Sequence, residues 1–504
     1  MKRASTLVCL LLAIAFLASR AKADDLLLKN TLVYNGTGKK PFRGDVRIHG
    51  DRITAVGKHL KPLPGETVLD QKGLALAPGF IDMHSHADQG IFDDPNAENV
   101  VRQGVTTVFV GQDGGSKYPL ADFLDKLEKH PAAINFASQV GQSTLRMQVM
   151  GKDLFRPSTP DELAKMRALL DKEMQAGAFG LSTGLEYAPA HFSTTEEVIE
   201  LSKVAAADGG FYTSHVRDEA EHVFDSYAEI IKIGKGARIR VEIQHAKLAA
   251  TSVWHTAATR MPQVFAEAKK EDVNLKADVY PYTYWQSTLA VIVPDRDYYN
   301  PAKVSKAIAE NGGADHLIFS NYPPDPSFVG KTLQDLADSW KVNTTDAYMQ
   351  VIKTAEDTGK GVTVIGVSMS EDDVRWFIAY PPIMFCSDGG LHDRHPRGAG
   401  TFPRILGHYV REEHVLSLPL AIHKMTELPA QQLGLSDRGR IAPGFVADLV
   451  VFDPATVIDG ATIQDPQAPP KGIPGVMVSG TWVVKDGQVT GEHPGKALRH
   501  AKSS

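Results

Sequence analysis

The stretch "APGFIDMHSHAD", residues 77–88, decides the fold class of this chain. Its apolar part, with Phe80 and Ile81, is typical of a buried strand, yet it ends on His84 and His86. Side chains two residues apart in a strand point to the same face. We therefore expect two imidazoles side by side at the carboxyl end of a buried strand.

Seven later stretches have the same form, a short apolar run that ends in polar residues. They read "TTVFVGQD", "INFASQVGQ", "AFGLSTGLEY", "GFYTSHVRD", "RVEIQHAK", "LKADVYPYT" and "IMFCSDGG". Helix-like segments separate them, which is typical of βαβ units and a parallel sheet. Because a TIM barrel has eight such strands, the sequence predicts an α/β fold with a (β/α)8 barrel over residues 77–437.

The two chain ends have a different pattern, with short β-like segments bounded by Gly, Asn or Asp. They occupy residues 24–76 and 438–497, so we expect one small, discontinuous β domain built from both ends. Roughly a hundred residues separate the seventh and eighth barrel strands, more than one crossover requires. We expect an insertion at about 291–345, either as a lid or as an elaboration of the barrel rim.

Composition is that of an ordinary globular protein, with 504 residues, 43% hydrophobic and 23% charged. The formal net charge is −6, and Lys and Arg do not gather in a stripe with aromatic residues. This argues against a nucleic-acid partner. The sequence does not indicate an oligomeric state.

The first 23 residues are typical of a signal peptide. They have a basic start, an apolar run from Leu7 to Leu17 too short to span a bilayer, and Ala-Lys-Ala before Asp24. We expect an exported protein, periplasmic or secreted, without a membrane anchor after cleavage. Cleavage would remove Cys9 and leave Cys386 without an internal disulfide partner, so we expect Cys386 to serve in packing.

The residues at the carboxyl ends of the predicted strands indicate a metal site, because TIM-barrel active sites lie at that end. One histidine at a strand end is usually structural, but six suitable groups at matching ends are a stronger signal. They are His84, His86, Glu186, His215, His245 and Asp388.

Imidazole and carboxylate ligands favour zinc or another first-row divalent ion. The ligand count fits one or two ions, with one at His84 and His86, the other at His215 and His245, a carboxylate between them, and Asp388 beside the first pair. Such ions activate water for hydrolysis. His392 and His395 follow in a Gly/Pro-rich loop, where we expect them to orient Asp388 or to pack.

These motifs resemble the N-acyl-D-amino-acid deacylase (D-aminoacylase) family of the amidohydrolase superfamily. The resemblance covers nearly all of the chain after residue 23 and rests on "PGFIDMHSHAD", "GLSTGLEYAPA", "TSHVRDEA", "IQHAK", "DVYPYT" and "SDGGLHDRHPRGAGTFPR". It implies hydrolysis of the amide of small N-acylated D-amino acids by a zinc centre. It also implies that the four histidines bind metal, that Asp388 shuttles a proton, and that Lys247 and Tyr280 hold the substrate carboxylate.

Two further cations, Arg217 and Arg296, are weaker candidates for substrate binding. Arg217 could instead pair with Asp218 or Glu219, and Arg296 lies in the expected insertion.

One departure from the family pattern concerns the residue that bridges the metals. Deacylases of this type carry Gly-Asn-Cys-Gly after the second strand, whereas this chain has Gly111-Gln112-Asp113-Gly114. Either Asp113 or Glu186 could replace the thiolate. We favour Glu186, because its longer side chain can reach the barrel axis, with Asp113 in a supporting role. Glu186 could also be a rim carboxylate paired with a cation.

Other functions fit the same residues. A dipeptidase or a cyclic-imide hydrolase would share the metal chemistry and differ only in the pocket. A non-catalytic binding protein could keep the barrel, although it has little use for Asp388 beside four histidines.

Overall fold

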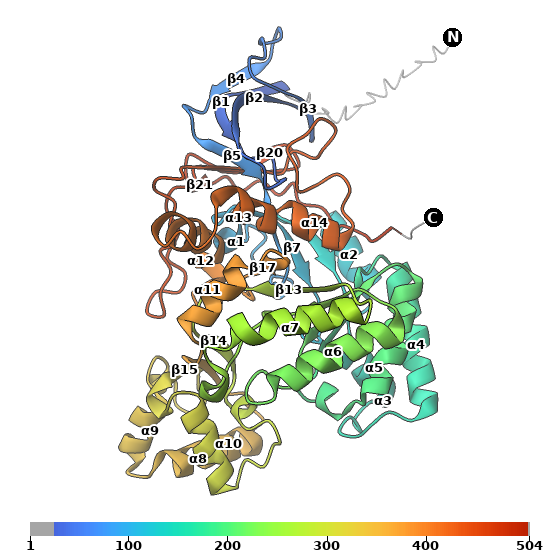
Figure 1. Cartoon of the computed structure of the whole chain (residues 1–504), viewed down its shortest axis with the longest axis vertical. Helices are drawn as coiled ribbons and strands as arrows, with labels where there is room; N and C mark the ends of the chain where they lie inside the picture. Colours follow the sequence, from blue (N-terminus) through green and yellow to red (C-terminus); the bar gives the residue numbers. More distant parts are fainter. Residues whose placement is uncertain (1–24, 502–504) are drawn as a thin grey trace, which may run out of the picture.

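The structure of the chain is a computed structural model that describes residues 25–501. The expected signal peptide, residues 1–23, lies outside the described residues. Along its long axis the molecule has a β domain, a barrel and a lobe (Figure 1). Among residues 25–501, no helix is long and apolar enough to cross a membrane.

The barrel has the eight strands expected from the sequence, which confirms the predicted fold class. Its strands, in chain order, are β6 (Phe80–Asp82), β7 (Val105–Val110), β8 (Asn135–Ser138) with its continuation β9 (Val140–Gly141), β10 (Gly180–Gly184), β11 (Phe211–His215), β12 (Val241–Ile243), β13 (Leu275–Val279) and β17 (Ile383–Phe385). Neighbouring strands pair in parallel. Between β17 and β6, the Ser387 N–H donates to Asp82 Oδ1 at 2.8 Å, and Ser85 forms a bridge with Gly389.

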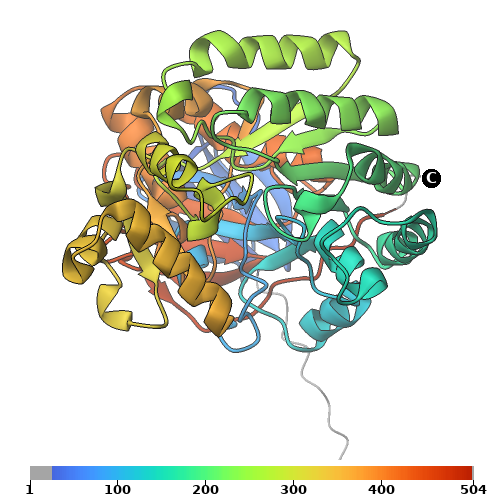
Figure 2. The ribbon, with the colours of Figure 1, turned by 90° about the horizontal axis from the view of Figure 1, so that it is seen from below.

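Helices surround these strands, as Figure 2 shows from below. They are α1 (Glu98–Val101), α2 (Leu120–Lys129), α3 (Gln142–Met150), α4 (Pro160–Gln175), α5 (Thr195–Ala207), α6 (Val223–Ala237), α7 (Ala257–Lys270), α11 (Glu371–Ala379), α12 (Arg397–Arg404), the π-helical segment Ile405–Glu412, α13 (Leu418–Met425) and α14 (Glu427–Leu433). Helix α4 illustrates their design: Thr159 and Glu162 form a capping box, and Met166, Leu170 and Met174, spaced by four, are buried.

The β domain joins both chain ends in one sheet. Its strands are β1 (Asp25–Val33), β2 (Phe42–His49), β3 (Arg52–Gly57), β4 (Thr67–Asp70), β5 (Ala75–Pro78), β18 (Leu449–Phe452), β19 (Gly475–Val478), β20 (Thr481–Lys485) and β21 (Gln488–Val489). Strand β5 pairs with β18, so the two ends meet at the centre of the sheet. Since β6 starts two residues after β5 ends, the sheet fixes the entry into the barrel.

A lobe between β13 and β17 lies on the side of the barrel opposite the β domain (Figure 1). It contains β14 (Trp285–Thr288), α8 (Pro301–Glu310), β15 (Leu317–Asn321), α9 (Leu333–Trp340), α10 (Thr344–Thr358) and β16 (Thr363–Gly366). The lobe packs around a second hydrophobic core, which also includes Tyr280 and Cys386 of the barrel. It extends beyond the expected 291–345 at both ends, because β14 and β16 pair antiparallel with Trp285 opposite Gly366.

Candidate metal centre

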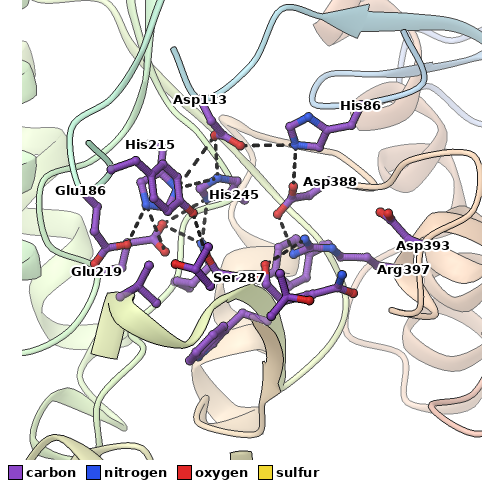
Figure 3. Close-up of a pocket in the computed structure, with 18 of the residues that line it drawn as sticks. His86, Asp113, Glu186, His215, Glu219, His245, Ser287, Asp388, Asp393 and Arg397 are labelled. Carbon is purple, nitrogen blue, oxygen red and sulfur yellow. Dashed lines mark hydrogen bonds and ion pairs between the residues drawn. The ribbon is translucent and has the colours of Figure 1, made fainter. Parts of the chain in front are cut away.

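Four histidines meet around the Asp113 carboxylate at the carboxyl ends of the strands. Asp113 Oδ2 lies 3.4 Å from His84 Nε2 and 3.3 Å from His86 Nε2. Asp113 Oδ1 lies 3.2 Å from His245 Nε2 and 3.8 Å from His215 Nδ1. Figure 3 shows Asp113 between His86 and the pair of His215 and His245. The structure thus brings all four predicted histidines together, with Asp113 at their centre.

Asp388 lies beside the first pair, as expected. Its Oδ1 is 3.4 Å from His84 Nε2 and 3.3 Å from His86 Nε2. One ligand atom from each of His84, Asp113, His245 and Asp388 lies within 4.8 Å of the others. Both ring nitrogens of His84 are buried without a hydrogen-bond partner among residues 25–501, which is costly for a polar group. This donor set of imidazole and carboxylate fits zinc, and the cluster can bind metal.

Three residues of this cluster lie just after their strands and have left-handed backbone conformations. The φ angles are +54° at Asp113, +33° at His245 and +49° at Asp388, a region that residues other than glycine adopt sparingly. Two hydrogen bonds hold these turns. The His245 N–H donates to Asp278 Oδ1 at 2.7 Å, and the Asp388 N–H donates to the His84 carbonyl at 2.8 Å.

Glu186 does not take the central position that the sequence favoured for it. Its Oε2 lies 2.8 Å from His215 Nε2, the ring nitrogen that faces away from Asp113. The chain turns after β10, where the Tyr187 N–H donates to the Gly184 carbonyl, and this turn carries the Glu186 carboxylate to the far side of His215. The shorter Asp113, directed by its left-handed backbone, reaches the axis instead.

A buried arginine that sequence reasoning missed holds Asp388. Arg397 Nη1 lies 2.6 Å from Asp388 Oδ2, and both side chains are almost fully buried. Burial alone would raise the pKa of the Asp388 carboxyl, but Arg397 and the neighbouring histidines hold it well below its usual range. In the sequence, Arg397 is one of several arginines in the loop after strand eight; only its place after His395-Pro396 could have marked it.

Asp113 is held ionised in a similar way. Burial would raise the pKa of its carboxyl, yet the charges and hydrogen bonds of His84, His245 and His86 outweigh burial and lower it well below the usual range. Burial raises the pKa of Glu186, and contact with His215 opposes that shift. The Asp113 carboxyl therefore ionises at a lower pH than the Glu186 carboxyl.

A cavity of about 620 Å³ opens from this cluster toward the lobe. Lys247, Tyr280 and Arg397 line it near the cluster, and Trp285 and Ile292 line it from the lobe. The Tyr280 hydroxyl is buried without a hydrogen-bond partner in the described part of the chain. One part of the wall thus offers two cations and a free hydroxyl, a good match for a carboxylate.

The two weaker arginine candidates lie elsewhere. Arg217 does not line the cavity and pairs neither with Asp218 nor with Glu219; its Nε and Nη2 each donate to Glu229 at 2.9 Å. Arg296 donates to the Glu186 carbonyl at 2.8 Å and lines a smaller neighbouring cavity of about 230 Å³.

The histidines after strand eight also stay out of the cluster. His395 Nδ1 accepts the Arg397 N–H at 3.0 Å, so it supports Asp388 through Arg397. The His392 side chain is 74% exposed. Cys386 is buried in the hydrophobic core shared with the lobe.

Comparison with known proteins places this geometry in context. A family model described as the amidohydrolase family matches residues 67–286 and 359–488. The interval between these two matches coincides with most of the lobe.

Two curated relatives from Alcaligenes xylosoxydans xylosoxydans match nearly the whole chain. A D-aminoacylase is 37% identical over 95% of this chain and 98% of its own length. An N-acyl-D-aspartate deacylase is 35% identical over 95% of each chain.

Solved structures of these enzymes are also similar to this chain. A crystal structure of D-aminoacylase superposes with a TM-score of 0.83 at 34% identity, covering 94% of this chain and 99% of the other; a further D-aminoacylase structure is described with a binuclear metal centre. N-acyl-D-glutamate deacylase from Bordetella bronchiseptica, complexed with zinc and a phosphonate inhibitor, has a TM-score of 0.85 at 31% identity, covering 95% and 100%.

Proposed function

The chain belongs to the amidohydrolase family, and within it to the family of the D-aminoacylases, and on this premise we propose that it hydrolyses N-acyl-D-amino acids to a carboxylate and a free D-amino acid. Hydrolysis of linear amide bonds is the common activity of these relatives. One observation carries the proposal: the cluster around Asp113 and Asp388 opens into the same cavity as Lys247, Tyr280 and Arg397. Such a cavity can hold an amide and a carboxylate at once.

The contacts within the cluster support an assignment of the metal ligands. His84 and His86 would hold one zinc ion and His215 and His245 a second, with the Asp113 carboxylate shared between them and Asp388 beside the first pair. When bound, the ions would polarise the amide carbonyl and lower the pKa of water toward about 7.

Asp388 is the group that moves the proton. It is ionised, because Arg397 and the histidines lower the pKa of its carboxyl, so it can accept a proton from the attacking water. It would then deliver this proton to the departing nitrogen as the C–N bond breaks, because an amide anion is too basic to leave. The products are a carboxylate and an amine.

The substrate's own carboxylate would lie against Lys247 and the Tyr280 hydroxyl, with Arg397 next to them. The Tyr280 ring lies 5.8 Å from Lys247 Nζ and 4.7 Å from the Arg397 guanidinium carbon. With the carboxylate and the amide fixed at two points of one cavity, the space left for the side chain would select one enantiomer. We assign the D series by similarity to the relatives.

We also propose that the protein is exported, and this part of the proposal rests on residues 1–23 alone. Their basic start, short apolar run and Ala-Lys-Ala sequence support a cleaved signal peptide and a periplasmic or secreted enzyme.

A substrate panel tests the reaction class. Zinc-loaded protein of residues 24–504 would be assayed with N-acetyl-D-leucine, N-acetyl-D-glutamate, D-dipeptides and dihydrouracil. We expect hydrolysis of at least one N-acetyl-D-amino acid at a kcat/KM well above that for the other two classes. Preference for dipeptides or for the cyclic imide would contradict the proposal and favour those activities.

A further inference from the structure

Glu219 is a buried carboxylate that the mechanism above does not use. It follows β11 by four residues, and its Oε1 lies 2.6 Å from Lys247 Nζ and 3.1 Å from His245 Nδ1. Its side chain is 12% exposed, and it lines the cavity. Figure 3 shows it on the side of His215 and His245 that is turned away from Asp113. One carboxylate thus contacts a histidine of the cluster and the lysine of the cavity wall.

With a metal ion on Nε2, His245 Nδ1 would carry a proton and need an acceptor, whereas an unprotonated Nδ1 can accept from the Lys247 ammonium. His245 directs Nε2 toward Asp113, which leaves Nδ1 as the outer nitrogen. Metal-binding imidazoles usually donate this second N–H to a carboxylate or a carbonyl, which fixes the ring. Lys247 Nζ lies 2.7 Å from Nδ1, but an ammonium group has no acceptor. Of these two neighbours, only Glu219 can accept a hydrogen bond from a protonated His245 Nδ1.

The lysine contact fixes a flexible group. A lysine side chain has four rotatable bonds, and holding it in one orientation costs conformational entropy. The Glu219 carboxylate accepts from the Lys247 ammonium at 2.6 Å, and both side chains are buried. This contact directs Lys247 Nζ to one place beside the cluster.

The backbone presents Glu219 rigidly. The Ala249 N–H donates to the Glu219 carbonyl at 2.8 Å, which joins the loop after β11 to the loop after β12. The neighbouring Asp218 accepts from the N–H groups of Ala220 and His222. A side chain on such a braced loop can orient its partners.

Glu219 is better suited to positioning than to binding a metal ion itself. His215, Glu219 and His245 do come close enough together to hold an ion. However, the Lys247 ammonium already lies within 2.7 Å of both Glu219 and His245, so an ion there would have to displace a cation that fits the carboxylate.

We propose that Glu219 is a positioning residue that orients His245 for the metal ion and Lys247 for the substrate carboxylate through one carboxyl group. The second half rests on the proposed function, because it takes Lys247 as the partner of the substrate. The first half concerns zinc affinity and holds whatever the substrate is.

The test compares Glu219→Gln with Lys247→Met. Zinc affinity of the metal-stripped proteins would be measured by competition with a chromophoric chelator, and KM and kcat with N-acetyl-D-leucine. Glu219→Gln is expected to weaken zinc binding by about 10- to 100-fold and to raise KM by about tenfold or more. Lys247→Met should raise KM and leave zinc affinity within about twofold, since its contact with His245 is not the one that fixes the ring.

Glu229→Gln is the matched control. Glu229 also holds a cation beside β11, namely Arg217, but contacts neither the cluster nor the cavity, so its zinc affinity and KM should equal those of the wild type. In the double variant of Glu219→Gln and Lys247→Met, the KM effects should be smaller than additive. If Glu219→Gln does not fold, Glu219→Asp, which withdraws the charge by one methylene, should show both changes to a smaller degree.

Wild-type zinc affinity in Glu219→Gln would overturn the proposal, as would an equal loss in Glu229→Gln. If the wild type binds zinc but does not hydrolyse the substrate, the proposed function fails, and the zinc affinities still decide the role of Glu219 toward His245.

Discussion

At the scale of single residues, two aspartates of the cluster differ in their neighbours, with Asp113 half-buried and Asp388 buried. Asp113 faces four imidazoles, whereas Asp388 has one oxygen toward His84 and His86 and the other on Arg397. These different neighbours are the reason why we propose a shared metal ligand in Asp113 and a proton carrier in Asp388.

Replacing Asp388 by asparagine should abolish proton transfer while leaving the cluster intact. We expect kcat to fall by about 10²- to 10⁴-fold, with zinc content close to that of the wild type, measured by plasma mass spectrometry on the same samples. Retained activity at normal zinc content would exclude Asp388 as the proton carrier.

Arg397→Gln should change the pH dependence. In the proposed mechanism the ionised Asp388 is the base, and its pKa is lowered, so activity should be lost as pH falls through that low pKa. Removing the Arg397 charge raises the pKa and moves the acid limb of the kcat/KM profile to higher pH. Lys247→Met, which does not touch Asp388, should move it less. An unchanged acid limb in Arg397→Gln would argue against this pairing.

Asp113→Asn tests which carboxylate is shared. Asparagine keeps the shape and tolerates the left-handed backbone, but it is a weaker ligand. We expect zinc content to fall from two ions toward one per chain, and Glu186→Gln to keep both. The reverse result would restore Glu186 to the bridging role that its length suggested.

At the scale of elements, the strand ends explain what the sequence could predict. Alternation within β6 and its continuation placed His84 and His86 on one face, and the ends of β11 and β12 placed His215 and His245. The sequence could not show whether Asp113 or Glu186 lies at the centre of the cluster. That choice depends on a left-handed turn at Asp113 and on a tight turn at Gly184–Tyr187. Neither turn has a signal in side-chain periodicity.

Helix capping gives a stability prediction that is independent of the site. Thr159 caps α4 by accepting from the Glu162 N–H at 3.3 Å. Thr159→Ala should lower the free energy of unfolding by about 1 kcal/mol, measured by urea denaturation, with zinc affinity unchanged. Thr358→Ala, at the C-terminal end of α10, is the control and should cost less. An equal loss in both variants would mean that the cap contributes nothing specific.

At the scale of the whole molecule, the fold was predictable because each barrel strand has a local sequence pattern, an apolar run that ends in polar residues, and this pattern occurs eight times. The meeting of the two chain ends could also be expected, since β-like segments flank the barrel. The limits of the lobe could not, because the pairing of Trp285 with Gly366 joins residues far apart in the sequence. Arg397 was missed for the same reason: its contact with Asp388 exists only once the loop after β17 has folded back.

Metal binding should stabilise the whole barrel, because the ligands come from strands that are distant in the sequence. An ion that binds only the folded state adds about 4 kcal/mol at a concentration 1,000 times its Kd. We expect chelation to lower the Tm, zinc to restore it and magnesium to leave it unchanged, as followed by calorimetry. A Tm that does not respond to zinc would contradict a metal site that spans the barrel.

The most direct measurement is the initial rate of amine release by metal-stripped protein, with and without added zinc, from matched N-acetyl-D-leucine and N-acetyl-L-leucine. The account predicts release that depends on zinc and occurs in the D series only. Equal rates for the two enantiomers, or a rate that zinc does not change, would contradict it.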